Sequence, residues 1–194
     1  MEIKEYVKIY DNCIPYESLS KFIKWINTIE FQDATVIGFD QNQKSIAVLN
    51  KDKRSVKEHG LFFTSKSMTN VNWFNYLTET FEKKIGQYYK NFKHAPHVRN
   101  IQSMSILKYE KNDHYVWHTD DSVAARRTLS LIFLLNNDYE GGELLFGDTI
   151  TEEEVYRVAV KPNRLIVWPS SFIFPHKVLP VKKGVRYSVV SWLV

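Results

Sequence analysis

The C-terminal half of this chain is a series of short β-rich runs separated by turn signals, and this pattern limits the possible folds. The runs are rich in β-branched and aromatic residues, and turns containing Asn, Gly or Pro divide them. Many short strands with turns between them are typical of a sandwich, barrel or jelly roll. The predicted strands are residues 101–109, 128–135, 143–146, 155–160, 164–168 and 185–194.

The N-terminal half has the periodicity of helices instead. Apolar residues recur at helical spacing within residues 19–29 and again within residues 74–88, which predicts two amphipathic helices. Thr69 or Asn70 is a candidate N-cap for the second helix. Between the helices lies a basic stretch, residues 51–57, which we predict to be a surface loop between short strands.

The two halves together predict one α+β domain over residues 1–194. In this interpretation residues 1–97 supply helical support and a lid, and residues 98–194 form a jelly-roll core. The candidate lid segments are residues 44–57 and residues 121–127.

Composition is that of a globular protein and sets limits on its partners. Hydrophobic residues make up 44% of the chain, so it can bury a core. The formal net charge is +4 without a block of like charges, which argues against a dedicated nucleic-acid arm. We find no secretory signal pattern and no apolar run that could span a membrane, and the single cysteine, Cys13, fits a reducing compartment. We therefore expect a cytoplasmic protein without a membrane partner; the sequence leaves the oligomeric state open.

A candidate metal site consists of the triplet His118-Thr119-Asp120 and a distant histidine, His176. In an extended segment the side chains at positions i and i+2 point to the same face, so His118 and Asp120 can bind one ion from one strand end. Two imidazoles and one carboxylate are the facial triad of non-haem Fe(II) enzymes, which leaves positions for oxygen and a co-substrate. The pattern indicates an oxygenase.

Other histidines compete for the third ligand position. His94 and His97 flank a proline at the predicted helix exit, and His114 lies in a predicted polar turn. His176 is favoured because it follows an apolar segment, where an unpaired buried imidazole is costly. The alternative is that His176 is a core histidine whose nitrogens are satisfied by neighbouring groups.

Arg186 lies in the last predicted strand, where a guanidinium needs an anionic partner. Ser188 shares its strand face and can donate a second hydrogen bond. We interpret Arg186 as a bidentate clamp on a ligand carboxylate, and the alternative is an internal salt bridge to Asp or Glu. Two other features are interpreted as structural: Gly141-Gly142 predicts a hairpin turn, and Trp168 and Trp192 are predicted core residues.

Together these motifs resemble the Fe(II)- and 2-oxoglutarate-dependent dioxygenases, specifically the microbial and viral members of the prolyl 4-hydroxylase-like branch. That branch carries Tyr-x-x-Gly-Gln-x-Tyr-x-x-His-x-Asp, a Leu-Asn…Gly-Gly-Glu-x-x-Phe segment, and a distal His followed by Lys or Arg. Asn112-Asp113 replaces the usual Gly-Gln here, and Asn tolerates the left-handed conformation of such a turn. The matching residues are Tyr109, Tyr115, His118 and Asp120, then Leu135-Asn136, Gly141-Gly142-Glu143 and Phe146, and finally His176 and Arg186.

The resemblance implies a double-stranded β-helix (a jelly roll) buttressed by the N-terminal helices. It implies hydroxylation of a substrate C–H bond with oxygen, release of succinate and CO2, and ascorbate as a further cofactor. The implied ligand sets are Fe(II) on His118, Asp120 and His176, and 2-oxoglutarate on Arg186, Tyr109 and Ser188.

The substrate is open at this stage. For peptidyl-proline, Tyr115 and Trp117 can offer a face to the pyrrolidine ring, and Arg126 or Arg127 can bond a peptide carbonyl. The alternatives are core packing for Trp117 and solvated arginines. A small molecule or a nucleic acid is the other substrate class, although the alkylation-repair branch carries a second Arg where this chain has Trp192. A cupin-type metal enzyme without 2-oxoglutarate and a non-catalytic binding module are the remaining classes.

Overall fold

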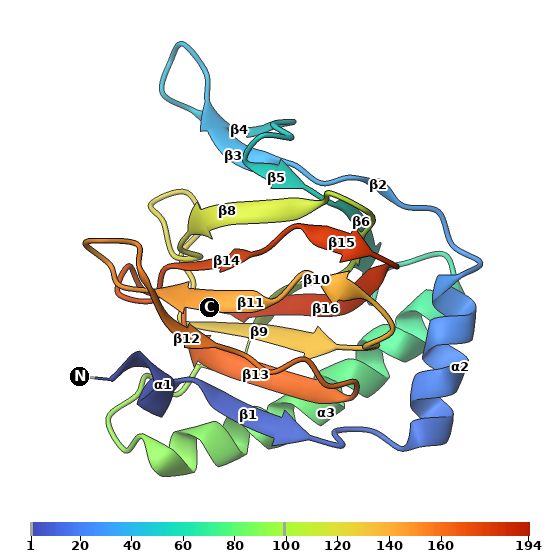
Figure 1. Cartoon of the computed structure of the whole chain (residues 1–194). Helices are drawn as coiled ribbons and strands as arrows, with labels where there is room; N and C mark the ends of the chain where they lie inside the picture. The colour runs from blue at the N-terminus through green and yellow to red at the C-terminus, as the bar shows by residue number, and fades with distance from the viewer. Residues whose placement is uncertain (1, 99) are drawn as a thin grey trace.

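Two antiparallel sheets packed face to face form the body of the molecule (Figure 1). The computed structural model describes residues 2–98 and 100–194. The larger sheet contains, in spatial order, β1 (Lys8–Asp11), β13 (Arg164–Pro169), β9 (Leu129–Leu134), β16 (Arg186–Leu193), β7 (Ile101–Tyr109), β6 (Lys57–Leu61) and β2 (Gln32–Asp33). The smaller sheet contains β12 (Glu154–Arg157), β11 (Leu144–Gly147), β14 (His176–Val178), β8 (His114–His118) and β5 (Arg54–Ser55). The arrangement confirms the predicted jelly roll with helical support.

The helices cover the outer face of the larger sheet (Figure 1). They are α2 (Tyr16–Ile26) and α3 (Met68–Asn91), preceded by the short α1 (Ile3–Tyr6). Phe22 of α2 and Phe81 of α3 are fully buried in one cluster with Phe133 of β9. The amphipathic stripes predicted from sequence therefore pack on the sheet as expected.

The start of α3 differs from the prediction. Ser67 is the N-cap, and its side chain accepts a hydrogen bond from the Asn70 backbone N–H at 3.4 Å. The Asn70 side chain instead bonds the backbone of the preceding segment, accepting from Phe62 N and donating to Gly60 O. Asn70 thus ties the helix to the end of β6.

The space between the sheets holds the second core cluster and the candidate site. Side chains of both sheets meet there, among them Phe146 from the smaller sheet and Tyr109, Ile132 and Trp168 from the larger. The predicted core position of Trp168 is confirmed, since it is 1% exposed.

The basic stretch is not a surface loop. Arg54–Ser55 forms β5 at the edge of the smaller sheet, and Lys57–Leu61 forms β6 in the larger one. The loop prediction was wrong because the strands are held by pairing with β8 and β7, which are distant in sequence. His114 likewise begins β8 and does not lie in a turn.

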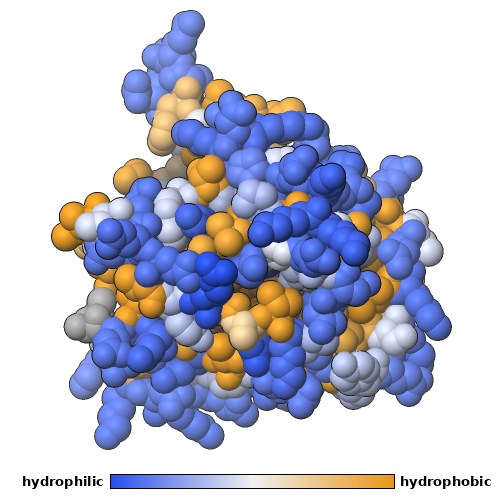
Figure 2. Space-filling model, in the orientation of Figure 1, coloured by the Kyte–Doolittle hydropathy of each residue, from blue (hydrophilic) through white to orange (hydrophobic). Residues whose placement is uncertain are grey.

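Two small pairs of strands complete the fold. The Gly141-Gly142 segment is not a hairpin turn, because β10 (Glu140–Gly141) pairs with β15 (Val181–Lys183) and not with β11. The strands β3 (Val36–Phe39) and β4 (Ser45–Val48) form a hairpin that projects from the body (Figure 1). Apolar residues gather where this hairpin joins the body (Figure 2).

Among the described residues, no helix is both long and apolar enough to cross a membrane.

Candidate active site

His118, Asp120 and His176 come together between the sheets, near one end. Strands β8 and β14 are paired neighbours, and His118 lies directly opposite His176 in their register. Asp120 follows the end of β8, so the triplet presents both of its ligands to the histidine of the next strand. Strand pairing thus brings together the two parts of the motif that are distant in sequence.

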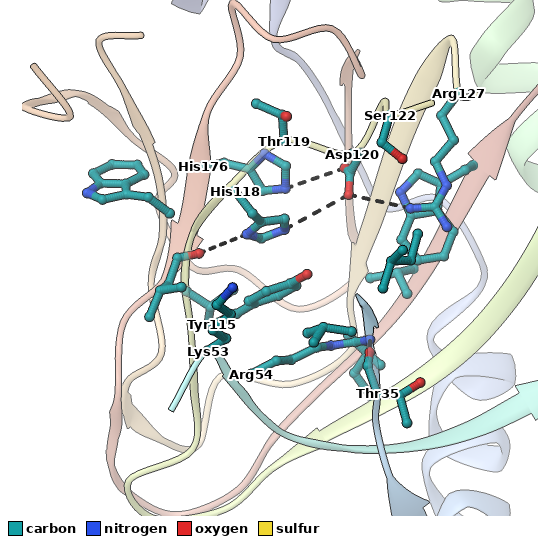
Figure 3. A pocket seen from close by; sticks show the side chains of 18 of the residues that line it. Thr35, Lys53, Arg54, Tyr115, His118, Thr119, Asp120, Ser122, Arg127 and His176 are labelled. Carbon is teal, nitrogen blue, oxygen red and sulfur yellow. Dashed lines mark hydrogen bonds and ion pairs between the residues drawn. The ribbon is translucent and has the colours of Figure 1, made fainter. Parts of the chain in front are cut away.

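The three side chains can ligate one metal ion. Asp120 Oδ1 lies 3.9 Å from His118 Nε2, and Asp120 Oδ2 lies 3.4 Å from His176 Nε2 (Figure 3). One potential ligand atom from each residue lies within 4.8 Å of the others. Neighbouring ligands of a six-coordinate ion with bonds near 2.1 Å are separated by about 3 Å, so small side-chain movements would close this set on an ion.

Hydrogen bonds to the other ring nitrogens orient both imidazoles. His118 Nδ1 lies 2.8 Å from Val116 O, and His176 Nδ1 lies 3.1 Å from Phe174 O. Because a carbonyl oxygen only accepts, each Nδ1 carries the proton and each Nε2 presents its lone pair toward Asp120. A metal-binding histidine is held in this way in most proteins, so the donor set fits a metal ion.

The protonation states also suit a cation. Burial and the neighbouring His176 lower the pKa of His118 to about 3, so its imidazole is neutral at pH 7. Burial alone would raise the pKa of Asp120, but the two imidazoles outweigh it, and the Ser130 hydroxyl and Arg127 also act to lower this pKa. Among the described residues, the Lys or Arg side chain that pairs with the Asp120 carboxylate is Arg127, at 3.8 Å.

Ser130 holds the carboxylate and was not predicted from sequence. Its hydroxyl donates to Asp120 Oδ2 at 2.6 Å and lies 2.7 Å from the Ser170 hydroxyl. Ser130 is 1% exposed and belongs to β9, where all residues are buried. A lone hydroxyl within the apolar run of residues 129–134 was the available signal.

A cavity of about 540 Å³ opens beside the triad. Both segments predicted as lid contribute to its wall: Lys53 and Arg54 from the first, and Ser122 to Ala124 with Arg127 from the second. The hairpin strand β3 lines it as well, through Val36, Ile37 and Phe39, which the prediction missed. Figure 3 shows the polar part of this wall around the triad.

Arg186 lies next to this cavity and has free donors. It begins β16 opposite Tyr109 in the register with β7, and its guanidinium lies 4.8 Å from the centre of the Tyr109 ring. Arg186 is 1% exposed, and no carboxylate of the described residues lies within ion-pair distance of it, so the internal salt bridge is wrong.

Two guanidinium nitrogens of Arg186, Nε and Nη2, are buried without a hydrogen-bond partner within 3.5 Å among the described residues, and the Tyr139 hydroxyl, which also lacks such a partner, interacts with this guanidinium. Nε and Nη2 share the edge that binds a carboxylate through two parallel hydrogen bonds. Ser188 accepts from Nη1 at 2.9 Å, and its hydroxyl hydrogen can still donate to a ligand, as predicted from the sequence. Tyr109 lines the cavity, whereas Arg186 and Ser188 do not.

The residues proposed for substrate contact divide into two groups. Tyr115, Trp117 and Arg127 line the cavity. The Tyr115 ring stacks on the His118 ring with 3.5 Å between centroids, and the Arg127 guanidinium lies 3.8 Å from the Trp192 ring. Arg126 does not line the cavity; its side chain is 76% exposed and lies 3.8 Å from Asp121. Trp192, predicted as core, is a cavity residue.

Comparison with known proteins shows what the part of the chain that carries this site is similar to. Residues 104–194 match the family model that is described as the 2OG-Fe(II) oxygenase superfamily. A PKHD-type hydroxylase of Synechococcus sp. (strain CC9902) is 37% identical over 100 residues, which are 50% of this chain and 43% of the relative. A PKHD-type hydroxylase of Herminiimonas arsenicoxydans is 38% identical over 96 residues, or 44% of this chain and 40% of the relative. The chain therefore spans less than half the length of these curated relatives.

Solved structures share the fold over nearly the whole chain. A prolyl hydroxylase from Trichoplax adhaerens, solved with a peptide fragment of the hypoxia inducible factor oxygen degradation domain, superposes with a TM-score of 0.74 at 15% identity, covering 100% of this chain and 87% of that one. A viral collagen prolyl hydroxylase from Paramecium Bursaria Chlorella virus-1, in complex with 2OG, gives 0.63 at 17% identity, covering 97% and 95%. Residues 104–194 are thus similar to the 2OG-Fe(II) oxygenase superfamily, and the curated relatives are named PKHD-type hydroxylases.

Proposed function

We propose that this protein is an Fe(II)- and 2-oxoglutarate-dependent dioxygenase that hydroxylates a substrate C–H bond and releases succinate and CO2. The observation that carries the proposal is the meeting of His118, Asp120 and His176 beside a cavity, within the residues that match the superfamily. The family match also argues against a cupin-type enzyme that works without 2-oxoglutarate.

In this proposal each residue has a defined task. His118, Asp120 and His176 hold Fe(II), which supplies the activation of oxygen when it is bound. Ser130 fixes the Asp120 carboxylate through its 2.6 Å hydrogen bond, and the two backbone carbonyls fix the imidazoles. The apolar cavity wall, which includes Ile132 and Val190, limits the entry of water.

The co-substrate 2-oxoglutarate is proposed to place its far carboxylate on Arg186. The support is the unpartnered Nε–Nη2 edge, with Tyr109 and Ser188 beside it. Because the cavity reaches Tyr109 but not Arg186, binding in this mode requires side chains around Tyr109 to move.

The proposed substrate is peptidyl-proline, and a small molecule is the second candidate. Structural neighbours named as prolyl hydroxylases support the first, and Tyr115 and Trp117 provide aromatic surface in the cavity wall. Arg127 can bond a peptide carbonyl, whereas the solvated position of Arg126 makes it a poor candidate. Ascorbate is the expected reductant, and we propose a cytoplasmic location because the one cysteine, Cys13, needs no oxidising compartment.

The test of the chemistry is succinate formation from 2-oxoglutarate with Fe(II), oxygen and ascorbate, measured first without a substrate. We expect iron-dependent succinate release by the wild-type chain and none by His118→Ala, Asp120→Ala or His176→Ala. His97→Ala is the matched control, since His97 stacks on Tyr89 outside the cavity. Full activity of His176→Ala would contradict the triad.

The test of the substrate is mass spectrometry of proline-containing peptides after the same incubation. A gain of one oxygen on proline is the expected result. Succinate release without such a gain, across peptides of varied flanking sequence, would favour the small-molecule candidate and leave the chemistry in place.

A further inference from the structure

Arg54 is a cation of the cavity wall that the proposed chemistry does not use. It belongs to β5, and its backbone pairs with Tyr115 of β8. Its guanidinium lies 5.2 Å from the centre of the Tyr115 ring, and the other neighbour of that ring is the imidazole of His118. Figure 3 shows Arg54 running along Tyr115, with Lys53 beside it. One aromatic ring therefore separates this guanidinium from a candidate metal ligand.

The hydrogen bonds of Arg54 are incomplete. Nη1 donates to Thr35 O at 2.8 Å, and Nη2 reaches Glu58 Oε2 at 3.5 Å, which is the limit of a hydrogen bond. Nε is buried without a partner among the described residues. The Arg54 side chain is only 12% exposed, and its one ion pair among the described residues is the long contact with Glu58, so an anion in the cavity could complete its hydrogen bonds and offset more of its cost of burial.

The charge of the cavity wall favours an anion as well. Its cationic side chains are Lys53, Arg54 and Arg127, and its one acidic side chain among the described residues is Asp120. Asp120 is committed to the triad, and Arg127 already donates to Gln102 and lies 3.8 Å from Asp120. The cationic side chains of the wall therefore outnumber its acidic ones, and Arg54 has only the Glu58 carboxylate, 3.5 Å away, as an ion-pair partner among the described residues, so the cavity attracts an anion.

We propose that Arg54 is a specificity-determining residue that binds a carboxylate of the substrate next to the C–H bond that reacts. This rests on the proposed function. Tyr115 lines the same cavity beside Arg54, and its phenol O–H can donate to the same carboxylate. The carboxylate can belong to an acidic side chain of a peptide or to a small carboxylic acid, because Arg54 recognises the shared group.

The test measures binding with Mn(II) and N-oxalylglycine, an unreactive analogue that occupies the 2-oxoglutarate site. The first probe pair is the peptide Ala-Glu-Pro-Ala and its counterpart Ala-Gln-Pro-Ala, and the second is N-acetylglutamate and N-acetylglutamine. Each pair differs in one charge at nearly constant shape. Calorimetry gives the ratio of dissociation constants within each pair, and the pair that shows the preference identifies the source of the carboxylate.

We expect the wild-type chain to bind the acidic member of at least one pair about tenfold or more tightly, and Arg54→Gln to reduce that ratio to about threefold or less. Arg157→Gln is the charge-matched control; its side chain is 48% exposed, pairs with Glu154 and is not in the cavity wall. Arg54→Lys keeps the charge without the planar fork, so an intermediate ratio is expected even if Arg54→Gln folds poorly.

Three outcomes would overturn the proposal. The wild-type chain could show no preference for either acidic probe, or Arg54→Gln could keep the wild-type preference. The third outcome is that Arg54→Gln loses more affinity for N-oxalylglycine than for the probes. The last outcome would assign Arg54 to the co-substrate site. Iron-dependent succinate formation by the wild-type chain, measured without these probes, tests the proposed function separately.

Discussion

Single hydrogen bonds fix the orientation of each candidate metal ligand. Val116 and Phe174 supply the carbonyl oxygens for the two imidazoles, and Ser130 supplies the hydroxyl for the carboxylate. Each hydrogen bond restricts the rotation of the metal-binding side chain before an ion binds, so less side-chain entropy is lost on binding. The affinity of the site is therefore expected to depend on residues that do not touch the metal.

Ser130→Ala tests this dependence. Without the 2.6 Å hydrogen bond, Asp120 can rotate away from His176, and we expect Mn(II) affinity to fall about 10- to 100-fold. Titration calorimetry or paramagnetic resonance of added Mn(II) measures it. Ser191→Ala is the control, because Ser191 is equally buried and donates to Ser103 O instead. Equal affinity in both variants would mean that Ser130 is a packing residue.

Arg186→Ala tests the co-substrate clamp. Loss of a buried guanidinium that pairs with a carboxylate costs about 2–5 kcal/mol in binding, so the dissociation constant of 2-oxoglutarate should rise roughly thirty-fold or more. Arg186→Lys should give an intermediate value, because Lys keeps the charge but not the two-bond edge. If Arg186→Ala melts earlier but binds 2-oxoglutarate as the wild type does, the residue is structural.

At the scale of elements, the segment between β10 and β11 makes room for Arg186. Gly142 has a φ of +66°, and a Cβ there would lie 3.0 Å from Arg186 Cδ and from Val181 Cγ2. The backbone of this segment therefore passes over the arginine side chain at a distance that only glycine permits. The two glycines were interpreted as a turn, but Gly142 also shapes the proposed co-substrate site.

Gly142→Ala and Gly86→Ala are expected to act in opposite directions. Gly142→Ala adds backbone strain of about 1–3 kcal/mol, so it should lower the free energy of unfolding. The added Cβ would also crowd the Arg186 side chain, so 2-oxoglutarate binding should weaken. Gly86 lies within α3 with open space around it, so Gly86→Ala should raise the free energy of unfolding by about 0.5–1 kcal/mol. Urea unfolding followed by circular dichroism checks both signs, and a stabilising Gly142→Ala would refute the close approach.

At the scale of the whole molecule, N-terminal strands complete sheets built from the C-terminal half. Strand β1 pairs with β13 at one edge of the larger sheet, and β6 pairs with β7 near the other. Asp11 at the end of β1 accepts two hydrogen bonds from Arg164, at 2.7 and 3.0 Å, and one from Lys161. These contacts tie N-terminal strands to strands of the C-terminal half.

The contribution of Asp11 to the stability of the folded protein should depend on pH. The hydrogen bond from Arg164, together with Lys161, lowers the pKa of Asp11 from 3.8 to about 2. A lowered pKa means that the carboxylate stabilises the fold fully above about pH 4, and that this stabilisation is lost as the pH falls through about 2. Asp11→Asn should therefore lower the melting temperature at pH 7 and make little difference near pH 2.

The control for this experiment is Asp52→Asn, because the Asp52 side chain makes no ion pair with a described residue. Differential scanning calorimetry at both pH values compares the two variants with the wild type. If Asp11→Asn lowers the melting temperature at pH 2 as much as at pH 7, the loss of stability does not come from the ionised carboxylate.

Local patterns in the sequence predicted β7, β9, β11, β12, β13 and β16, the two long helices and the three residues of the candidate triad, but they did not mark β8, β10, β14 or β15. Alternation and helical periodicity depend on which face of an element is buried, and His118-Thr119-Asp120 carries its own geometry at the end of a strand. The left-handed turn at Asn112 was also predicted, and its φ is +72°. These features need no information about distant residues.

Only the tertiary structure decided which polar residues face the cavity. Arg54 lies in a basic stretch assigned to a loop and has no local pattern that marks it, and the lone hydroxyl of Ser130 in an apolar strand does not show which group it contacts. They reach the site because β5 pairs with β8, and because β9 crosses behind the triad. The availability of Arg186 Nε and Nη2 also depends on the tertiary structure, because Arg186 is 1% exposed and no described residue accepts a hydrogen bond from either nitrogen within 3.5 Å. Pairing between distant strands sets these contacts, and it depends on the packing of the whole chain.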